Sequence, residues 1–484
     1  QQVLARVVLD ACVTAAREAT ERWNSEEAAR WWDDAVRAFD LLPAAERSPG
    51  DRDDLLVARV EALARAGRGQ TVLDVVDAGL LDAVRDGRTS TAGRLAAALL
   101  RAAGAWPWVS YGKDPGPVLD RLAALEPFVA ADRAAHARVL AALAVGSCYH
   151  PDSSVPDGMS RTALEIARGL ADPDVVADAL LGRILLYSGV ATHSRESARL
   201  TDELLALPHQ QARFDEVIAH AVASMTLMNL GDVDAATSHV RLGIAGCDLL
   251  RLPVLRVQLR WMEATLAAWH GDFAETRRHY DTATQFHLQT ELYTAGSSDL
   301  ATNTLEWEYG TLADADPGTV EPDSWSIAIA GARRDTATVI RDIEQWAAKG
   351  APFTWTTLGH RTLIARVVAD LALVDYAEMF LELLDPFTDR IATVGQVGVI
   401  GSVAEVCARL QALLGRTDAA AALLDRAEDL ATRTSSPPTL LRCRLLRAQL
   451  RPDSPERSRE IAAIADEAAR TGMLGLAAYA RSIP

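Results

Sequence analysis

Aromatic and basic residues gather between positions 260 and 355, where they could bind a small molecule. Six of the eleven tryptophans lie in this stretch, together with tyrosines and arginines. The candidate residues for a ligand or partner site are Arg260, Trp261, Trp269, Arg277, Tyr280, Trp307, Trp325 and Trp355. Aromatic rings can line a pocket for an apolar or planar ligand, and arginines can orient an anionic group. The alternative is that the rings fill gaps between helices, which is the commoner role of such residues.

Other patterns that could do chemistry are weak. His270, His279 and His287 are nine and eight residues apart, whereas paired metal ligands on a helix usually stand three or four residues apart. Residues 395–401 have the pattern GxxGxxG, which differs from the GxGxxG of a dinucleotide-binding turn, and no strand is expected before them. We therefore expect no metal site and no cofactor. We expect these glycines to open a helix that runs to Leu414 and to let two helices approach closely.

Catalytic motifs are missing from the sequence. It contains neither a GxSxG nucleophile elbow nor a GxxxxGK[ST] phosphate-binding loop. Pairs of carboxylates such as Glu306 and Glu308 occur, but catalysis needs two carboxylates opposed across a cleft, which a sequence does not show. The sequence therefore predicts a protein that is not an enzyme and has no catalytic residues.

We expect paired helices to position these side chains, because the same turn motif occurs three times in the sequence, at 231–236, 271–276 and 415–420. Each copy starts with Gly and has a small residue five positions later, with further small residues seven after and twelve before that position. These small residues are Ser224, Ala236, Gly243, Ala264, Thr276, Ala283, Ala408, Ala420 and Ala427. This spacing is typical of tetratricopeptide-like repeats, in which antiparallel helices pack closely at small contact points. The Gly permits the left-handed residue that ends the first helix.

Composition agrees with a wholly helical fold. The chain has 484 residues, of which 49% are hydrophobic and 6% aromatic, with much Ala and Leu. Alternating runs of β-branched residues are nearly absent, so strands are not expected. We predict an all-α, tetratricopeptide-like solenoid of about a dozen helix pairs, at ~34–40 residues a pair. Residues 1–313 and 324–484 form its two parts, continuous across a possible seam and hinge at 314–323, which is rich in Asp and Pro.

Charge and cysteine content limit the partners and the compartment. The formal net charge is −17, which disfavours direct binding of nucleic acid. Five widely spaced cysteines without a CxxC motif favour a reduced, cytoplasmic protein with buried thiols. No apolar run reaches the ~18 residues of a membrane span, so we expect no membrane association. The chain starts at Gln1 without Met and without a visible signal peptide, which suggests a piece of a longer polypeptide.

Several stretches resemble one known family. They are Ser25-Glu26-Glu27-Ala28-Ala29-Arg30-Trp31-Trp32, the aromatic stretch 106–112 (WPWVSYG), 163–173 (ALEIARGLADP), 201–207 (TDELLAL) and 398–404 (GVIGSVA). Together they resemble the C-terminal repeat half of large SARP-type and LuxR-type bacterial transcriptional regulators. These belong to the STAND class, the signal-transduction ATPases with numerous domains. The resemblance covers most of the chain.

The resemblance implies a sensor function. In that family the ATPase and DNA-binding modules lie elsewhere in the polypeptide, and the repeat half receives an inducer or a partner and releases the ATPase. We therefore expect a non-catalytic sensor and interaction module that binds its ligand or partner on the concave face. The alternative is a stand-alone scaffold for protein–protein interaction that has no small-molecule ligand.

Overall fold

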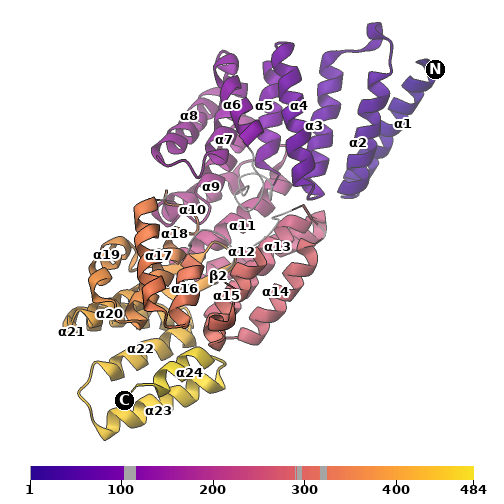
Figure 1. Ribbon diagram of the computed structural model, residues 1–484. Helices are drawn as coiled ribbons and strands as arrows, with labels where there is room; N and C mark the ends of the chain where they lie inside the picture. Colours follow the sequence, from indigo (N-terminus) through magenta and orange to yellow (C-terminus); the bar gives the residue numbers. More distant parts are fainter. Residues whose placement is uncertain are drawn as a thin grey trace.

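The computed structural model describes residues 2–102, 116–288, 290–291, 297–316, 324–350 and 352–483. Within these ranges the chain forms 24 α-helices, a few short 3-10 helices and two short strands. Most helices contact the helix that precedes or follows them in the chain, so the molecule is built as a stack of helices (Figure 1). The prediction of an all-α helical solenoid is confirmed.

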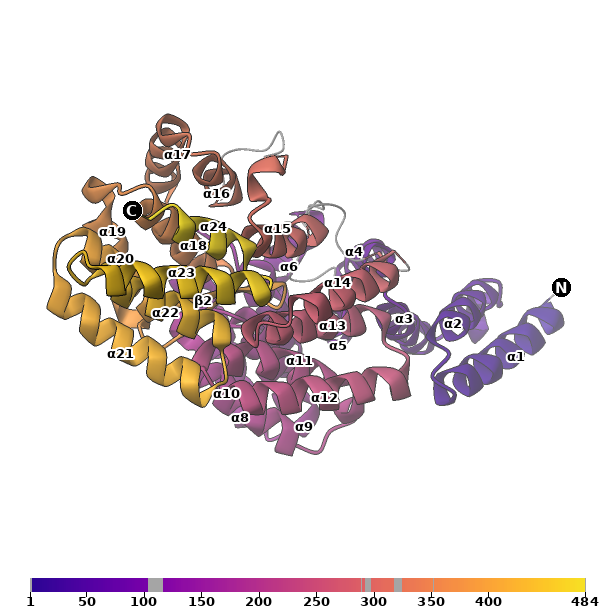
Figure 2. The ribbon, with the colours of Figure 1, turned by 90° about the horizontal axis from the view of Figure 1, so that it is seen from below.

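The first part of the stack extends away from the rest of the molecule, and α1 and α2 form its outer end (Figure 2). Its elements are α1 (Gln2–Glu21), α2 (Ser25–Asp40), η1 (Ala44–Glu46), α3 (Pro49–Arg65), α4 (Gly69–Arg85), α5 (Thr89–Leu100), α6 (Gly116–Val129), α7 (Arg133–Gly146), α8 (Ser154–Leu170), α9 (Pro173–Leu186), η3 (Ala191–His193) and α10 (Ser194–Ala206). The aromatic stretch at 106–112 lies outside the described residues.

The middle part contains the clearest repeats. Its elements are α11 (Ala212–Leu230), α12 (Val233–Leu250), α13 (Pro253–Trp269), α14 (Phe273–His287), α15 (Ser297–Tyr309) and η4 (Leu312–Asp314). The last part turns back, so that its final helices lie beside α13 to α15 (Figure 2). Its elements are α16 (Ser324–Ala332), α17 (Thr336–Lys349), α18 (Thr357–Asp370), α19 (Val374–Leu384), η5 (Asp385–Phe387), β1 (Ile391–Val394), β2 (Gly398–Ser402), α20 (Val403–Leu413), α21 (Thr417–Arg433), α22 (Pro437–Gln449), α23 (Pro455–Arg470) and α24 (Leu474–Arg481).

The repeated turn has the predicted geometry. Gly231, Gly271 and Gly415 have φ angles of 76°, 81° and 73°, in the left-handed region that glycine adopts without strain. The next residue in the first two copies, Asp232 or Asp272, accepts a hydrogen bond from a backbone amide three residues on, at 3.2 and 3.0 Å. A Gly that ends one helix is thus followed at once by an Asp that begins the next.

The small residues of the pattern are buried at helix contacts. Ser224, Ala236, Ala264 and the other non-glycine members of the set have 0% exposure. A Cβ at the ninth member, Gly243, would lie only 2.8 Å from a methyl carbon of Leu259 on α13. A larger side chain at these positions would separate the helices, because cores are packed without spare volume.

The glycine-rich segment forms a β-hairpin, so the prediction of a helix from Gly395 to Leu414 and of no strands is wrong there. Strands β1 and β2 pair antiparallel, with Ile391 opposite Ser402 and Val394 opposite Gly398. The β-branched residues of β1 favour an extended backbone, and Gly395, with φ of 54°, starts the turn. The helix α20 starts only at Val403.

The hairpin occupies the centre of the molecule (Figure 1). It contacts α11, α13 and α15 of the middle part and α18, α20 and α21 of the last part. Helical side chains bind its backbone carbonyls: Asn229 Nδ2 donates to Ile391 O at 3.1 Å, and Thr265 Oγ1 donates to Gln396 O at 2.9 Å. These hydrogen bonds attach the last part of the chain to the middle repeats over a long sequence separation.

An ionic cluster around the buried Arg101, which directly follows α5, joins this end of α5 to α7, α9 and α11. The guanidinium of Arg101 donates to Asp215 at 2.8 and 2.6 Å and to Asp178 at 2.7 Å. Arg138 also donates to Asp178, at 2.6 Å, and His209 Nε2 lies 3.0 Å from Asp215. Burial raises the pKa of Asp215, but the charge of Arg101 and the hydrogen bonds outweigh burial, so the net pKa is lowered.

Three further observations bear on the sequence predictions. Among the helices described, none is long and apolar enough to cross a membrane. Four of the five cysteines are buried, and all five are free thiols. Residues 317–323 of the predicted seam lie outside the described residues, so the hinge stays a prediction. Beside it, the guanidinium of Arg333 donates to Ala313 O and Ala315 O, both at 2.8 Å.

Candidate functional site

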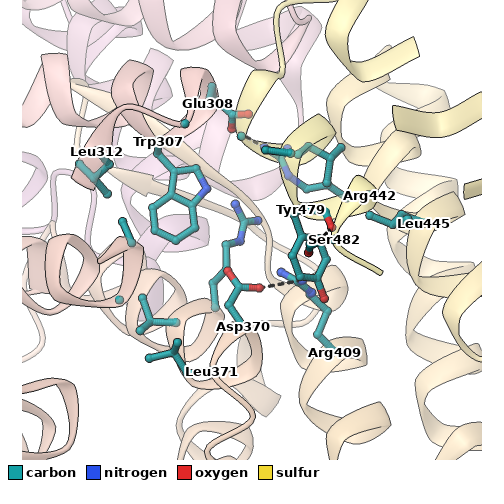
Figure 3. A pocket seen from close by; sticks show the side chains of 18 of the residues that line it. Trp307, Glu308, Leu312, Asp370, Leu371, Arg409, Arg442, Leu445, Tyr479 and Ser482 are labelled. Carbon is teal, nitrogen blue, oxygen red and sulfur yellow. Dashed lines mark hydrogen bonds and ion pairs between the residues drawn. The ribbon is translucent and has the colours of Figure 1, made fainter. Parts of the chain in front are cut away.

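A cavity of about 320 Å³ opens between the middle repeats and the end of the chain. Its walls come from α15, η4, α16, α18, α20, α22 and α24, which span residues 307 to 482. Figure 3 shows it from close by. Its volume is at the lower end of the range for small-molecule sites, about 300–1,000 Å³.

Two aromatic side chains face the cavity from opposite sides. Trp307, in the last turn of α15, lies on one side, and Tyr479 of α24 lies on the other (Figure 3). The guanidinium carbon of Arg366 is 6.0 Å from the centroid of the Trp307 ring, and that of Arg409 is 5.5 Å from the Tyr479 ring. Gln449 Nε2 donates to the Tyr479 hydroxyl at 3.1 Å and fixes this side chain. These contacts are cation–π arrangements, which hold the rings and the guanidinium groups in place.

Two glycines allow α15 and α24 to approach closely enough to form this wall. A Cβ at Gly475 would lie 2.7 Å from the carbonyl oxygen of Trp307, and a Cβ at Gly310 would lie 3.0 Å from the Cα of Gly475. Gly310 also has a φ angle of 75°. The contact between the middle repeat and the last helix is therefore made backbone to backbone, and any side chain at Gly475 would separate the two helices.

The polar lining is formed by ion pairs. Arg366 Nη2 lies 3.1 Å from Glu405 Oε2, and Arg409 Nη2 lies 2.8 Å from Asp370 Oδ1. At the far end of the cavity Arg442 pairs with Glu308 (Figure 3). A fourth arginine, Arg334, is exposed at the rim. The lining contains three carboxylates, Glu308, Asp370 and Glu405, and four arginines, so it carries one positive charge in excess.

Arg366 is the most buried of these cations, with 3% of its surface exposed. Its Nε has no hydrogen-bond partner among the described residues. Burial lowers the pKa of Arg366, and the nearby charges of Arg442 and Arg409 lower it further against the opposing effect of Glu405. An arginine stays charged even so. A buried cation with an unused donor can bind an acceptor atom of a ligand.

Of the eight residues that the sequence predicts for the site, Trp307 lines this cavity. Trp261 and Tyr280 lie instead in the core that α13 and α14 share with α22 to α24. The Tyr280 hydroxyl donates to Val397 O of the hairpin at 2.7 Å. Trp269 Nε1 donates to the carbonyl of Thr434 at 3.2 Å. These three side chains hold the last part of the chain against the middle repeats.

The remaining predicted residues are also placed by contacts within the chain. Trp325 and Trp355 belong to the core around α16 to α20, and Trp355 packs against the hairpin at Gly395. Arg260 pairs with Glu263, and the guanidinium of Arg277 lies 5.7 Å from the centroid of the Tyr309 ring. For the seven predicted residues other than Trp307, ligand binding stays a prediction.

Sequence reasoning missed the other residues of the cavity, which are far apart in the chain. One signal was present at Arg366, which interrupts the otherwise apolar run Leu363 to Val368 on a buried helix. A charged residue in such a run is rarely buried unless it is paired. Nothing in the sequence pairs Arg409, Arg442 and Tyr479 with it, because only the return of the chain brings these residues together.

The described residues contain no group of three or more His, Cys, Asp or Glu side chains arranged to hold a metal ion. A scan against protein-family models gives no match to this chain, and a search of curated proteins gives none either. The resemblance to STAND regulators therefore depends on the sequence stretches quoted above, and the chemistry of the cavity has to be argued from its own residues.

Proposed function

We propose that this chain is the non-catalytic sensor module of a multidomain bacterial transcriptional regulator of the STAND class. A small-molecule inducer binds in the cavity between α15, α18, α20, α22 and α24. The observation that supports this proposal is a cavity of about 320 Å³ that is lined by opposed aromatic rings and by four arginines, of which Arg366 is buried. In a solenoid built by close packing, such a volume is space that a ligand can fill.

The position of the cavity suggests how a ligand would act. Its walls join α15 and η4 of the middle repeats to α24 at the end of the chain. A ligand that contacts both sides favours the arrangement in which they are together. Ligand binding shifts a conformational equilibrium only when the ligand prefers one state. In this proposal the preferred state changes how the repeats dock on an ATPase module, and the module acts in the cytoplasm.

The partners in this proposal are protein modules. With a net charge of −17 the chain repels phosphate backbones, so contact with DNA belongs to another module of the regulator. Because this chain is acidic, it would dock most favourably on a basic face of the ATPase module.

The test is a thermal-shift screen of the purified chain against a panel of metabolites. An inducer present at a hundred times its Kd stabilises the folded state by about 2.7 kcal/mol. Ala478 is exposed and lines the cavity, so Ala478→Trp fills it without disturbing the core. Ala462→Trp, at an exposed position of α23 outside the cavity, is the matched control. A metabolite that stabilises both variants equally binds elsewhere and contradicts the proposal.

A second candidate function is a stand-alone scaffold without a small ligand. It is favoured by the outer end of the stack, where Leu4 and Val7 of α1 are 65% and 59% exposed. Exposed apolar residues in a group mark a protein-binding face. A protein partner that is lost with Leu4→Glu and Val7→Glu, together with no melting shift for any metabolite, would favour this function over the first.

A further inference from the structure

We infer that the cavity selects a monoanionic ligand in which a carboxylate is attached to a flat apolar or aromatic body. This inference depends on the proposed function, because it names the ligand class of the same cavity. It follows from three properties of the lining: its excess of positive charge, its unused donors and its two opposed rings.

The charge excess sets the charge of the ligand. Four arginines and three carboxylates line the cavity, which leaves one positive charge. The whole chain carries −17, so this local excess runs against the general charge of the protein. Attraction between charges is stronger in a partly enclosed site than in water. A single carboxylate compensates the excess, whereas a phosphate monoester would leave about one negative charge without a partner.

The donors that remain on the arginines match a carboxylate. A guanidinium has several N–H donors in a planar fork that fits a carboxylate. Arg366 has one close carboxylate contact, to Glu405 at 3.1 Å, and its Nε has no partner among the described residues. Arg442 likewise has a single carboxylate partner, Glu308. The buried Arg366 therefore has a donor that the carboxylates of the cavity do not use.

The rings select the body of the ligand. Trp307 and Tyr479 face the cavity from opposite sides (Figure 3). Both rings are held by guanidinium groups, at 6.0 and 5.5 Å from their centroids, so their positions are fixed before a ligand binds. Flat apolar groups bind between such rings by burying their faces. The apolar residues Leu312, Leu445 and Leu446 complete the surroundings of this body.

The test compares acids with their neutral amides by isothermal titration calorimetry on the whole chain. The probe pairs are 1-naphthoate with 1-naphthamide and indole-3-acetate with indole-3-acetamide, and phenyl phosphate is the dianionic probe. Each pair has the same body, so only the charge differs. We expect the acid to bind roughly tenfold or more tightly than its amide, because a charge-assisted hydrogen bond contributes about that difference in affinity. Phenyl phosphate should bind more weakly than the acids.

Two substitutions in one ion pair should change the affinity for the acid in opposite directions. Arg442→Gln removes the excess charge and should weaken acid binding about tenfold, whereas Glu308→Gln raises the excess and should tighten it. Binding of the amide should change less than binding of the acid in both variants, and far-UV circular dichroism checks that each variant folds. The matched control is Arg444→Gln, on the same helix, where Arg444 pairs with Glu467 at 2.8 Å outside the cavity.

Equal affinity for acid and amide, tightest binding of phenyl phosphate, or unchanged acid binding in Arg442→Gln would each overturn the inference. If the amides bind as tightly as the acids and Ala478→Trp abolishes binding of both, the inference fails and the proposed function stands. If neither member of any pair binds, the inference fails as well. The proposed function fails with it only when no metabolite of the wider panel shifts the melting temperature.

Discussion

Replacing Tyr280 by Phe separates the two roles that this residue can have. The sequence predicts Tyr280 as a ligand residue, whereas the structure has its hydroxyl donating to Val397 O of the hairpin at 2.7 Å, with Thr304 Oγ1 at 3.2 Å. The side chain is 6% exposed. Burial raises the pKa of Tyr280 to about 12, with the Thr304 hydrogen bond and the charge of Arg277 opposing it. The hydroxyl therefore stays protonated, and keeps its proton to donate, up to about pH 10.

The size of the effect follows from what Tyr280→Phe removes. The ring stays, so the apolar surface that it buries is unchanged, and only the oxygen is lost. Removing one partner of a buried hydrogen bond leaves a carbonyl without its donor, which costs about 1–3 kcal/mol. We expect the free energy of unfolding to fall by that amount. Urea unfolding followed by far-UV circular dichroism should show a lower midpoint with an unchanged slope m.

The control for this experiment is Tyr376→Phe. The Tyr376 hydroxyl donates to Glu344 Oε1 at 3.0 Å on the surface, so its loss should change stability by less than about 0.5 kcal/mol. Tyr280→Phe with the same urea midpoint as the wild type would refute the argument that this hydroxyl holds the hairpin. Loss of probe binding without loss of stability would instead make Tyr280 a ligand residue, as the sequence predicts.

Three other substitutions or reagents test the packing of the molecule. Arg101→Met removes the arginine partner of the buried Asp215 and leaves Asp178 with Arg138 alone, so it should lower the free energy of unfolding by about 3–5 kcal/mol; a loss of under about 1 kcal/mol in urea unfolding would contradict this. Burial raises the pKa of Cys247 and Cys407 to about 12, so Ellman's reagent at pH 8 should label them only as the protein unfolds, and immediate labelling would contradict their burial. Burial lowers the pKa of His220 and His239, whose Nδ1 atoms are 3.0 Å apart, so their neutral forms stabilise the fold above the unfolded pKa of about 6.5. That stability is lost as pH falls below this value, and His239→Gln should lose less stability than the wild type between pH 7 and 5 when melting is followed by calorimetry.

Local rules of helix packing were enough to predict the repeats. The left-handed Gly at 231, 271 and 415 and the small residues around it act within one helix pair, so their spacing is visible in the sequence. The number of helix pairs follows from the same rule, and the 24 helices in the described part of the chain agree with about a dozen pairs.

The hairpin could have been predicted, because its signal is also local. Ile391-Ala392-Thr393-Val394 is rich in β-branched residues and is followed by Gly395 and Gly398. That combination is typical of two strands joined by a tight turn. The helical context of the whole chain favoured reading the glycines as helix contacts. What the sequence does not show is that the hairpin is enclosed by helices from two parts of the solenoid, which makes a short sheet stable.

The cavity could not be predicted in the same way, because it depends on contacts between non-neighbouring repeats. In an open solenoid each repeat contacts only its neighbours. Here Gly475 of α24 lies against the backbone of Trp307 on α15, and Arg442 pairs with Glu308 across 134 positions of sequence. Such pairs have no spacing rule. The cavity lies where α24 returns to α15. A ligand bound between Trp307 and Tyr479 therefore contacts both the middle part and the end of the chain. A ligand there would stabilise the closed arrangement by its contacts to the two sides, which is the differential affinity that a sensor needs.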